Sequence, residues 1–110
     1  MSSKQSIVDY LVNQVSSAGI VSAKKMFGEY AIYCNEKVVA LVCDDRLFIK
    51  PTAEGKIFID EYDEGLPYPG AKPWLLIPEE KWDEQEWLSQ LIQITAMSLP
   101  LPKPKRLKKK

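Results

Sequence analysis

The sequence contains no histidine among its 110 residues. Histidine is the commonest general base at neutral pH and the commonest metal ligand, so its absence removes most catalytic triads and most zinc sites. The five glycines form neither a GxGxxG nor a Walker pattern, so no phosphate-binding loop is predicted. We therefore predict a non-enzymatic protein with no catalytic residues, no cofactor and no metal site.

Long hydrophobic runs are also missing. Stretches such as Val38 to Cys43 are far shorter than the roughly 18 residues that a membrane span requires. The first ten residues lack the apolar core and the cleavage site of a signal peptide. From these absences we expect a cytoplasmic protein without membrane contact.

The net charge of zero hides an asymmetry along the chain. Residues 103–110 carry six cations and no acid, so the other 102 residues hold 9 basic and 15 acidic groups, a net charge of −6. We predict one domain over residues 1–100 and a basic, flexible tail over 101–110. The tail could contact the phosphates of nucleic acid, without reading base sequence, through Lys103, Lys105, Arg106, Lys108, Lys109 and Lys110. Alternatively, it solubilises the protein or lies against the acidic body.

Apolar periodicity predicts a helix at each end of the domain. The first begins near Ser2, which has capping-box spacing to Gln5, and stops at Gly19. The last begins after Asp83, which has the same spacing to Glu86, and is ended by Pro100. Each helix has one apolar stripe, so each is expected to pack by one face.

Between these helices the sequence predicts mainly strands. A short strand at 21–25 precedes three strands at 29–34, 37–43 and 46–51, which the dipeptides Asn35-Glu36 and Asp44-Asp45 connect. Asn and Asp tolerate the left-handed conformation of two-residue hairpin turns, so we predict an antiparallel meander. Residues 52–62 weakly favour a short helix, 63–73 are predicted to be a loop, and 74–77 a last strand.

Both faces of this predicted sheet are apolar. Regular two-residue turns would place Tyr30, Ile32, Cys34, Val39, Leu41, Cys43 and Phe48 on one face and further apolar residues on the other. Because a sheet exposed on one side alternates apolar and polar residues, we expect cover on both faces. Helices would cover one face, and a partner, a second subunit or another part of the chain would cover the other. A helix on each side is the alternative.

The two cysteines are the remaining chemical candidates. In this register Cys34 and Cys43 share a face but lie on the order of 20 Å apart, too far for a disulfide. Lys37 and Arg46 are their predicted cross-strand neighbours and could favour a thiolate. We expect structural thiols, and a thiol-based redox protein stays as an alternative.

Three stretches carry a resemblance to a known family. The runs MFGEYAIY, ALVCDDRLFIK and IPEEKWDEQEWLSQLIQITA resemble the TfoX amino-terminal domain family of the TfoX (Sxy) competence regulators, and the resemblance covers roughly residues 8–100. The most diagnostic residues are Met26, Phe27 and Gly28, whose role is structural. The sequence departs from the family pattern where it has Glu29, Glu36 and Asp45 instead of glycine.

The resemblance implies both a fold and a function. The implied fold is α+β, an antiparallel β-sheet meander flanked by an N-terminal and a C-terminal helix in a two-layer, secretion-chaperone-like arrangement. The implied function is that of a regulatory or interaction domain, linked to transcription or competence, which contacts a protein partner or forms a homodimer through an apolar sheet face or helix. No catalytic residue belongs to the family pattern.

Overall fold

Two tight hairpins determine how the central strands pair. The computed structural model describes residues 4–26 and 29–100. Strands β2 (Glu29–Cys34), β3 (Lys37–Cys43) and β4 (Arg46–Ile49) follow one another with two residues in each connection. The four turn residues all have positive φ: 52° at Asn35, 72° at Glu36, 54° at Asp44 and 58° at Asp45. These are the left-handed pairs of type I′ turns, so the predicted two-residue hairpins are confirmed.

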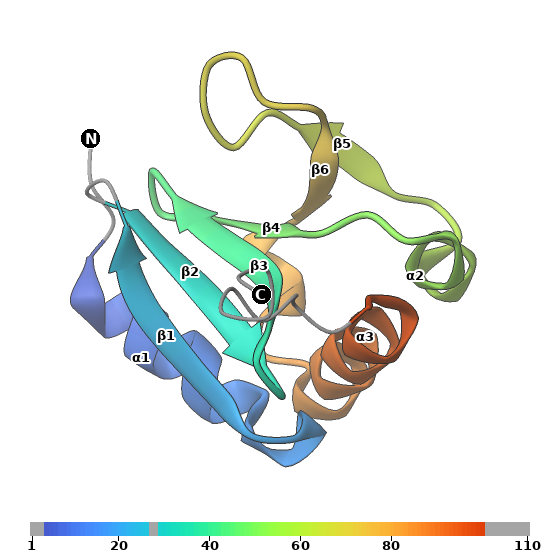
Figure 1. Cartoon of the computed structure of the whole chain (residues 1–110), viewed down its shortest axis with the longest axis horizontal. Coiled ribbons are helices and arrows are strands. Elements are labelled where there is room, and N and C mark those ends of the chain that lie inside the picture. Colours follow the sequence, from blue (N-terminus) through green and yellow to red (C-terminus); the bar gives the residue numbers. More distant parts are fainter. Residues whose placement is uncertain (1–3, 27–28, 101–110) are drawn as a thin grey trace, which may run out of the picture.

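The complete sheet has six strands in the order β1-β2-β3-β4-β6-β5, and all neighbouring pairs are antiparallel (Figure 1). Strand β1 (Val21–Met26) lies at one edge, and β5 (Asp63–Gly65) lies at the other, beside β6 (Trp74–Ile77). The meander is confirmed. The prediction that 63–73 is entirely loop was wrong at β5, which is held in place by its ladder with β6.

The helices form two long elements and several short ones. Helix α1 (Gln5–Gln14) is followed by the 3₁₀ turn η1 (Ser16–Ala18), so the first helix is shorter than predicted. Its N-cap is Lys4, which makes no side-chain cap bond, and the predicted cap Ser2 lies outside the described residues. The short helix α2 (Ala53–Ile59) confirms the weak helix signal in that region.

The last helix differs from the prediction at its start. The 3₁₀ turn η2 (Glu79–Lys81) precedes α3 (Gln85–Ser98), whose N-cap is Glu84 and not Asp83. The predicted capping box was therefore wrong. Asp83 instead accepts a hydrogen bond from the Tyr10 hydroxyl of α1, a long-range partner that local spacing does not reveal. The helix stops just before Pro100, as predicted.

Both long helices pack on the same face of the sheet and form the core with it (Figure 1). Their fully buried side chains include Val8, Leu11, Leu88 and Leu91. Four strands, β2, β3, β4 and β6, contribute buried residues to this inner face, namely Tyr30, Ile32, Cys34, Val39, Ala40, Val42, Leu47, Ile49, Leu75 and Ile77. The predicted α+β, two-layer fold is confirmed. No helix over residues 4–26 and 29–100 is long and apolar enough to cross a bilayer.

A bulge in the sheet alters the predicted assignment of residues to faces. Ile32 pairs with Ala40 but Tyr33 pairs with Val38, so Val39 is an extra residue in β3. Beyond this bulge the pairing is shifted by one position, and Tyr30 lies opposite Val42 instead of Leu41. Leu41 and Cys43, together with Phe48 opposite Leu41, therefore lie on the face away from the helices. The prediction that these three residues share a face with Tyr30 was wrong, because one extra residue in a strand moves the side chains beyond it to the other face.

The face away from the helices, which we call the outer face, carries Ala31, Cys43 and Phe48 as buried residues outside the main core cluster. In the described part of the chain no helix lies on it, so the alternative of a helix on each side was wrong. The Phe48 ring on this face reaches across to the edge strand β5. Gly65 of β5 lies so close to the Phe48 ring that an added Cβ would be 3.1 Å from it, which explains why β5 has glycine at this position.

Candidate functional site

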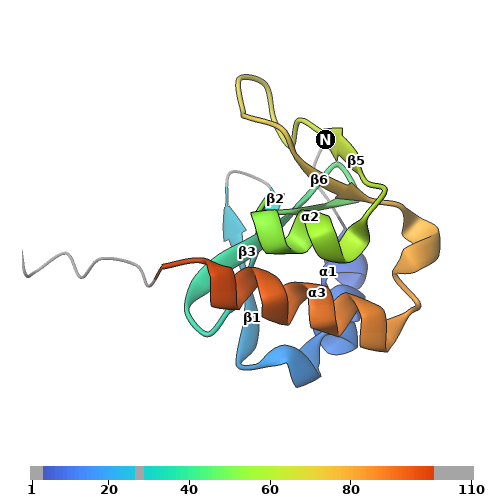
Figure 2. The same cartoon turned by 90° about the vertical axis from the view of Figure 1, so that its right-hand side faces the viewer.

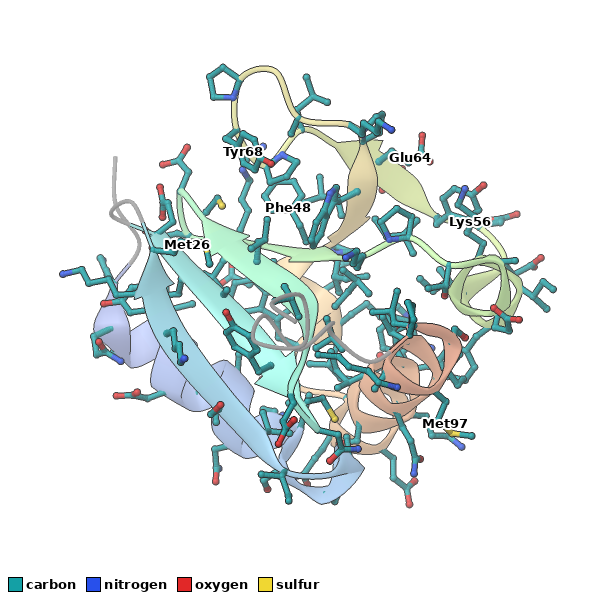
Figure 3. The ribbon with its side chains drawn as sticks, viewed as in Figure 1. Met26, Phe48, Lys56, Glu64, Tyr68 and Met97 are labelled. Atoms are coloured by element: carbon teal, nitrogen blue, oxygen red, sulfur yellow. The ribbon has the colours of Figure 1, made fainter. Side chains whose placement is uncertain are left out.

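The most exposed apolar side chains of the helical layer meet between α2 and α3. Ile57 of α2 is 79% exposed and Met97 of α3 is 76% exposed. The two helices lie side by side (Figure 2), and Met97 points away from the sheet (Figure 3). They border an open groove of about 550 Å³, which we call the helical groove and which is lined by Glu54, Ile57, Phe58, Ile94, Met97 and Ser98. Exposed apolar residues gathered in one groove indicate a contact surface.

Local sequence explains why α2 forms and why it lies so close to α3. The Thr52 hydroxyl accepts a 2.9 Å hydrogen bond from the Gly55 N–H, which caps the first turn. Gly55 is buried against α3, and a Cβ at this position would lie 3.6 Å from the Leu91 side chain. Phe58, which also lines the groove from α2, contacts the Trp87 ring of α3 at a centroid distance of 5.8 Å. Packing between α2 and α3 therefore fixes the position of the groove, while Ile57 and Met97 at its edges stay exposed.

Acidic side chains continue from the groove toward β5. Residues 54–64 carry the exposed carboxylates of Glu54, Asp60, Glu61, Asp63 and Glu64 and a single cation, Lys56, whose ammonium lies 5.7 Å from the centre of the Tyr62 ring. No ion pair involves any of these five carboxylates within the part of the chain that the structure describes. Lys56 and Glu64 lie on the side of the molecule that carries α2 (Figure 3).

The chain direction changes sharply between α2 and β5. Asp60 has φ 74° and ψ −77°, and the N–H of Glu61 donates to the Ile59 carbonyl at 3.0 Å. This is a γ-turn with positive φ, a rare and strained geometry for a residue with a side chain. The turn borders a second hollow of about 350 Å³, where Asp60, Glu61 and Asp63 face Lys81 and Trp87. Negative charge therefore extends beyond the end of the helical groove.

The outer face of the sheet is the other apolar surface. Tyr33, Val38, Leu41 and Leu76 are half-buried on it. Two cations lie over its aromatic rings: the Lys24 ammonium is 5.5 Å from the Tyr33 ring centre, and the Arg46 guanidinium is 5.2 Å from that of Phe48. The exposed Leu66 and Tyr68 of the β5–β6 connection follow at its edge.

Comparison with known proteins identifies the family of this chain. The model of the TfoX N-terminal domain matches residues 13–98, which is most of the chain. The chain belongs to the TfoX N-terminal domain family. It is also similar to a protein of Spirochaeta aurantia named "Uncharacterized 12.7 kDa protein in trpE 5'region", with 38% identity over 110 residues that cover all of this chain and 95% of the relative. Membership supports a small regulatory-type domain.

The family motif lies mostly outside the described residues. Of its three members, Met26 ends β1, pairs with Glu29 and is 36% exposed. Phe27 and Gly28 lie outside the described residues, as do the tail cations Lys103, Lys105, Arg106, Lys108, Lys109 and Lys110. In this TfoX N-terminal domain, Met26 lies at the end of β1, away from Met97 and the helical groove (Figure 3).

The two thiols of this TfoX N-terminal domain are buried and free. The bulge places them on opposite faces: Cys34 belongs to the helical core, where its Sγ lies 3.8 Å from the Ala18 carbonyl, and Cys43 lies on the outer face. The prediction that they share a face was wrong, but the conclusion that they form no disulfide with each other is confirmed.

Burial controls the ionisation of both thiols. Burial raises the pKa of Cys34, and the nearby Lys37 only partly opposes it. Burial together with Glu29 and Asp44 raises the pKa of Cys43 to about 11, although Arg46 acts in the opposite direction. The predicted cationic neighbours are therefore present, but desolvation outweighs them. Both thiols are protonated at neutral pH, which makes them poor nucleophiles.

Sequence reasoning missed the helical groove. Met97 does carry a signal, because it is an apolar residue off the buried stripe of α3 that Leu88, Leu91 and Ile92 define. Ile57 carries none, since its neighbours fit a strand as well as a helix. In residues 4–26 and 29–100, no three acidic or cysteine side chains gather as metal ligands do.

Proposed function

We propose that this TfoX N-terminal domain is a non-enzymatic regulatory or interaction domain that binds a protein partner through the helical groove. The observation that carries the proposal is the exposure of Ile57 and Met97, at 79% and 76%, on either side of one groove. Burying an apolar side chain of this size contributes about 1.5–3 kcal/mol. A partner that covers both residues therefore gains a large part of the free energy of a specific contact.

The proposed role is regulation, in transcription or in competence, in the cytoplasm. Family membership supports a regulatory-type domain, and the family takes its name from a competence regulator. The partner is either a regulatory protein or a second copy of this chain. Such a contact needs an apolar surface held in place by packing and needs no reactive group. The groove is lined mainly by apolar side chains and is held by the packing of α2 on α3.

The test compares two isoleucines of equal exposure. Ile57→Asp introduces a charge into the groove, whereas Ile20→Asp introduces the same charge at a site that is 80% exposed and outside the groove. Partners captured from cell extract are identified by mass. Binding of each purified partner is then measured with the unsubstituted chain, with Ile57→Asp and with Ile20→Asp. We expect Ile57→Asp to weaken binding at least about tenfold, equivalent to 1.4 kcal/mol, and Ile20→Asp to leave it unchanged.

Self-association is measured in parallel by sedimentation of the same three proteins. A homodimer through the groove dissociates with Ile57→Asp and persists with Ile20→Asp. Equal effects of the two substitutions on every partner and on self-association would contradict the proposal, because the contact would then lie elsewhere.

Nucleic-acid binding by the tail is the second candidate. The observation in its favour is the charge distribution: residues 103–110 carry six cations, whereas the remaining chain has a net charge of −6 and repels a polyanion. Duplex DNA binding by the full chain should then have a logarithmic salt slope no steeper than about −5. Replacing all six cations with glutamine should abolish it. Binding that survives this replacement would exclude the tail as the contact.

A further inference from the structure

We propose that residues 101–110 of this chain bind along the helical groove and the acidic surface beyond it, and so cover the groove when no partner is bound. The inference rests on the proposed function only in taking the groove as a binding surface. It requires no partner to exist. The physical grounds are the place where α3 ends, the charges of the two surfaces and the apolar residues of the segment.

The position of α3 brings the segment to the groove. Met97 and Ser98, in the last turn of α3, line the groove, and residue 101 follows three positions later. Ten residues span up to about 33 Å when extended. Helix α2, which forms the other wall, has 7 residues and is therefore about 10 Å long. The segment is long enough to run along the whole groove and to reach Asp60 to Glu64.

Opposite charges favour this path. The segment carries six cations, and the stretch from Glu54 to Glu64 presents five exposed carboxylates against one lysine. The carboxylates lie at the rim and beyond the end of the groove, whereas its lining is mostly apolar. Attraction between exposed charges extends over about 10 Å at 0.1 M salt, so it can hold the segment along this side of the molecule.

The apolar residues of the segment match the groove. Leu101 and Leu107 interrupt the basic run, and the groove between Ile57 and Met97 has room for an aliphatic side chain. The outer face of the sheet is a poorer site for the same segment, because Lys24 and Arg46 lie over its aromatic rings and repel a cationic chain.

A spin label at the end of the segment tests the proposal in the full chain. Lys110→Cys adds one thiol to the segment, and a nitroxide attached to it shortens the relaxation times of nearby methyl groups. The native thiols do not interfere, since Cys34 and Cys43 are buried and protonated at neutral pH. We expect the methyl signals of Ile57 and Met97 to be lost. Val38 should keep its signal, because it lies on the outer face, although its neighbour Lys37 donates a hydrogen bond to the Ala96 carbonyl in the last turn of α3.

Charge controls separate a bound segment from one that merely passes nearby. The lost signals should return at 1 M salt, where the screening length falls to about 3 Å, and when the other five cations are replaced with glutamine. The substitutions Asp60→Asn and Glu61→Gln should also restore the methyl signals. Glu79→Gln and Glu80→Gln, which neutralise two exposed acids of η2, should not.

Three outcomes overturn the proposal. Equal signal loss at Ile57 and Val38 means that the segment has no preferred site. Loss that is unaffected by salt excludes the charge attraction. Loss that occurs only when spin-labelled chains are mixed with isotope-labelled chains assigns the contact to a second copy. Each is independent of the partner experiment, in which Ile57→Asp and Ile20→Asp can still differ.

Discussion

Glu36 occupies a backbone position that favours glycine, so Glu36→Gly is expected to stabilise the protein. Its φ of 72° is in the left-handed region, where a residue with a side chain costs about 1–2 kcal/mol more than glycine. Glycine also gains freedom in the unfolded chain, which offsets about 0.4–1 kcal/mol. The net gain is therefore roughly 0.5–1 kcal/mol, and a domain of this size should melt a few degrees higher.

Asp45→Gly is the matched control, because Asp45 occupies the same position in the second hairpin with φ 58°. The Asp45 carboxylate accepts a 2.9 Å hydrogen bond from the Lys4 N–H at the start of α1. Losing such a bond costs about 0.5–1.5 kcal/mol. The relief of strain and the lost bond should nearly cancel, so Asp45→Gly is expected to change stability little.

Urea unfolding followed by tryptophan fluorescence gives the two free energies of unfolding, and thermal unfolding gives the melting temperatures. The expected order is Glu36→Gly above the unsubstituted chain and above Asp45→Gly. A destabilised Glu36→Gly, or a larger gain from Asp45→Gly, would refute the assignment of strain to these turns.

Two further predictions concern ionisation and packing. Burial raises the pKa of the Cys43 thiol from 9.0 to about 11. The stability that this shift gives the folded state is present below pH 9 and is lost as the pH rises through 11, and it is on the order of 2 kcal/mol. The free energy of unfolding of the unsubstituted chain should therefore fall more steeply over this pH range than that of Cys43→Ala. Leu91→Ala should lower the free energy of unfolding by about 2–5 kcal/mol because Leu91 is fully buried. Met97→Ala should change it by less than about 0.5 kcal/mol because that side chain is exposed. Calorimetry measures both, and a large effect of Met97→Ala would mean that the groove residues stabilise the fold and are not kept for binding.

Elements whose signals are local were predicted well. The turn dipeptides at 35–36 and 44–45 fixed strands β2 and β3 to the residue, because two-residue hairpins leave no freedom in where the strands begin. The periodicity of the last helix and Pro100 located the end of α3. The absence of histidine and the charge distribution are likewise properties of the sequence alone.

Features that depend on distant residues were decided only by the tertiary structure. Asp83 is spaced to cap a helix but accepts a hydrogen bond from Tyr10, 73 positions away in the chain. Strand β5 exists because β6 supplies its hydrogen-bond partners, and the bulge at Val39 moves Cys43 to the face opposite Cys34. The helical groove has the same origin. Ile57 and Met97 are 40 positions apart, and the packing of α2 against α3, at Gly55 and Phe58, brings them to one surface.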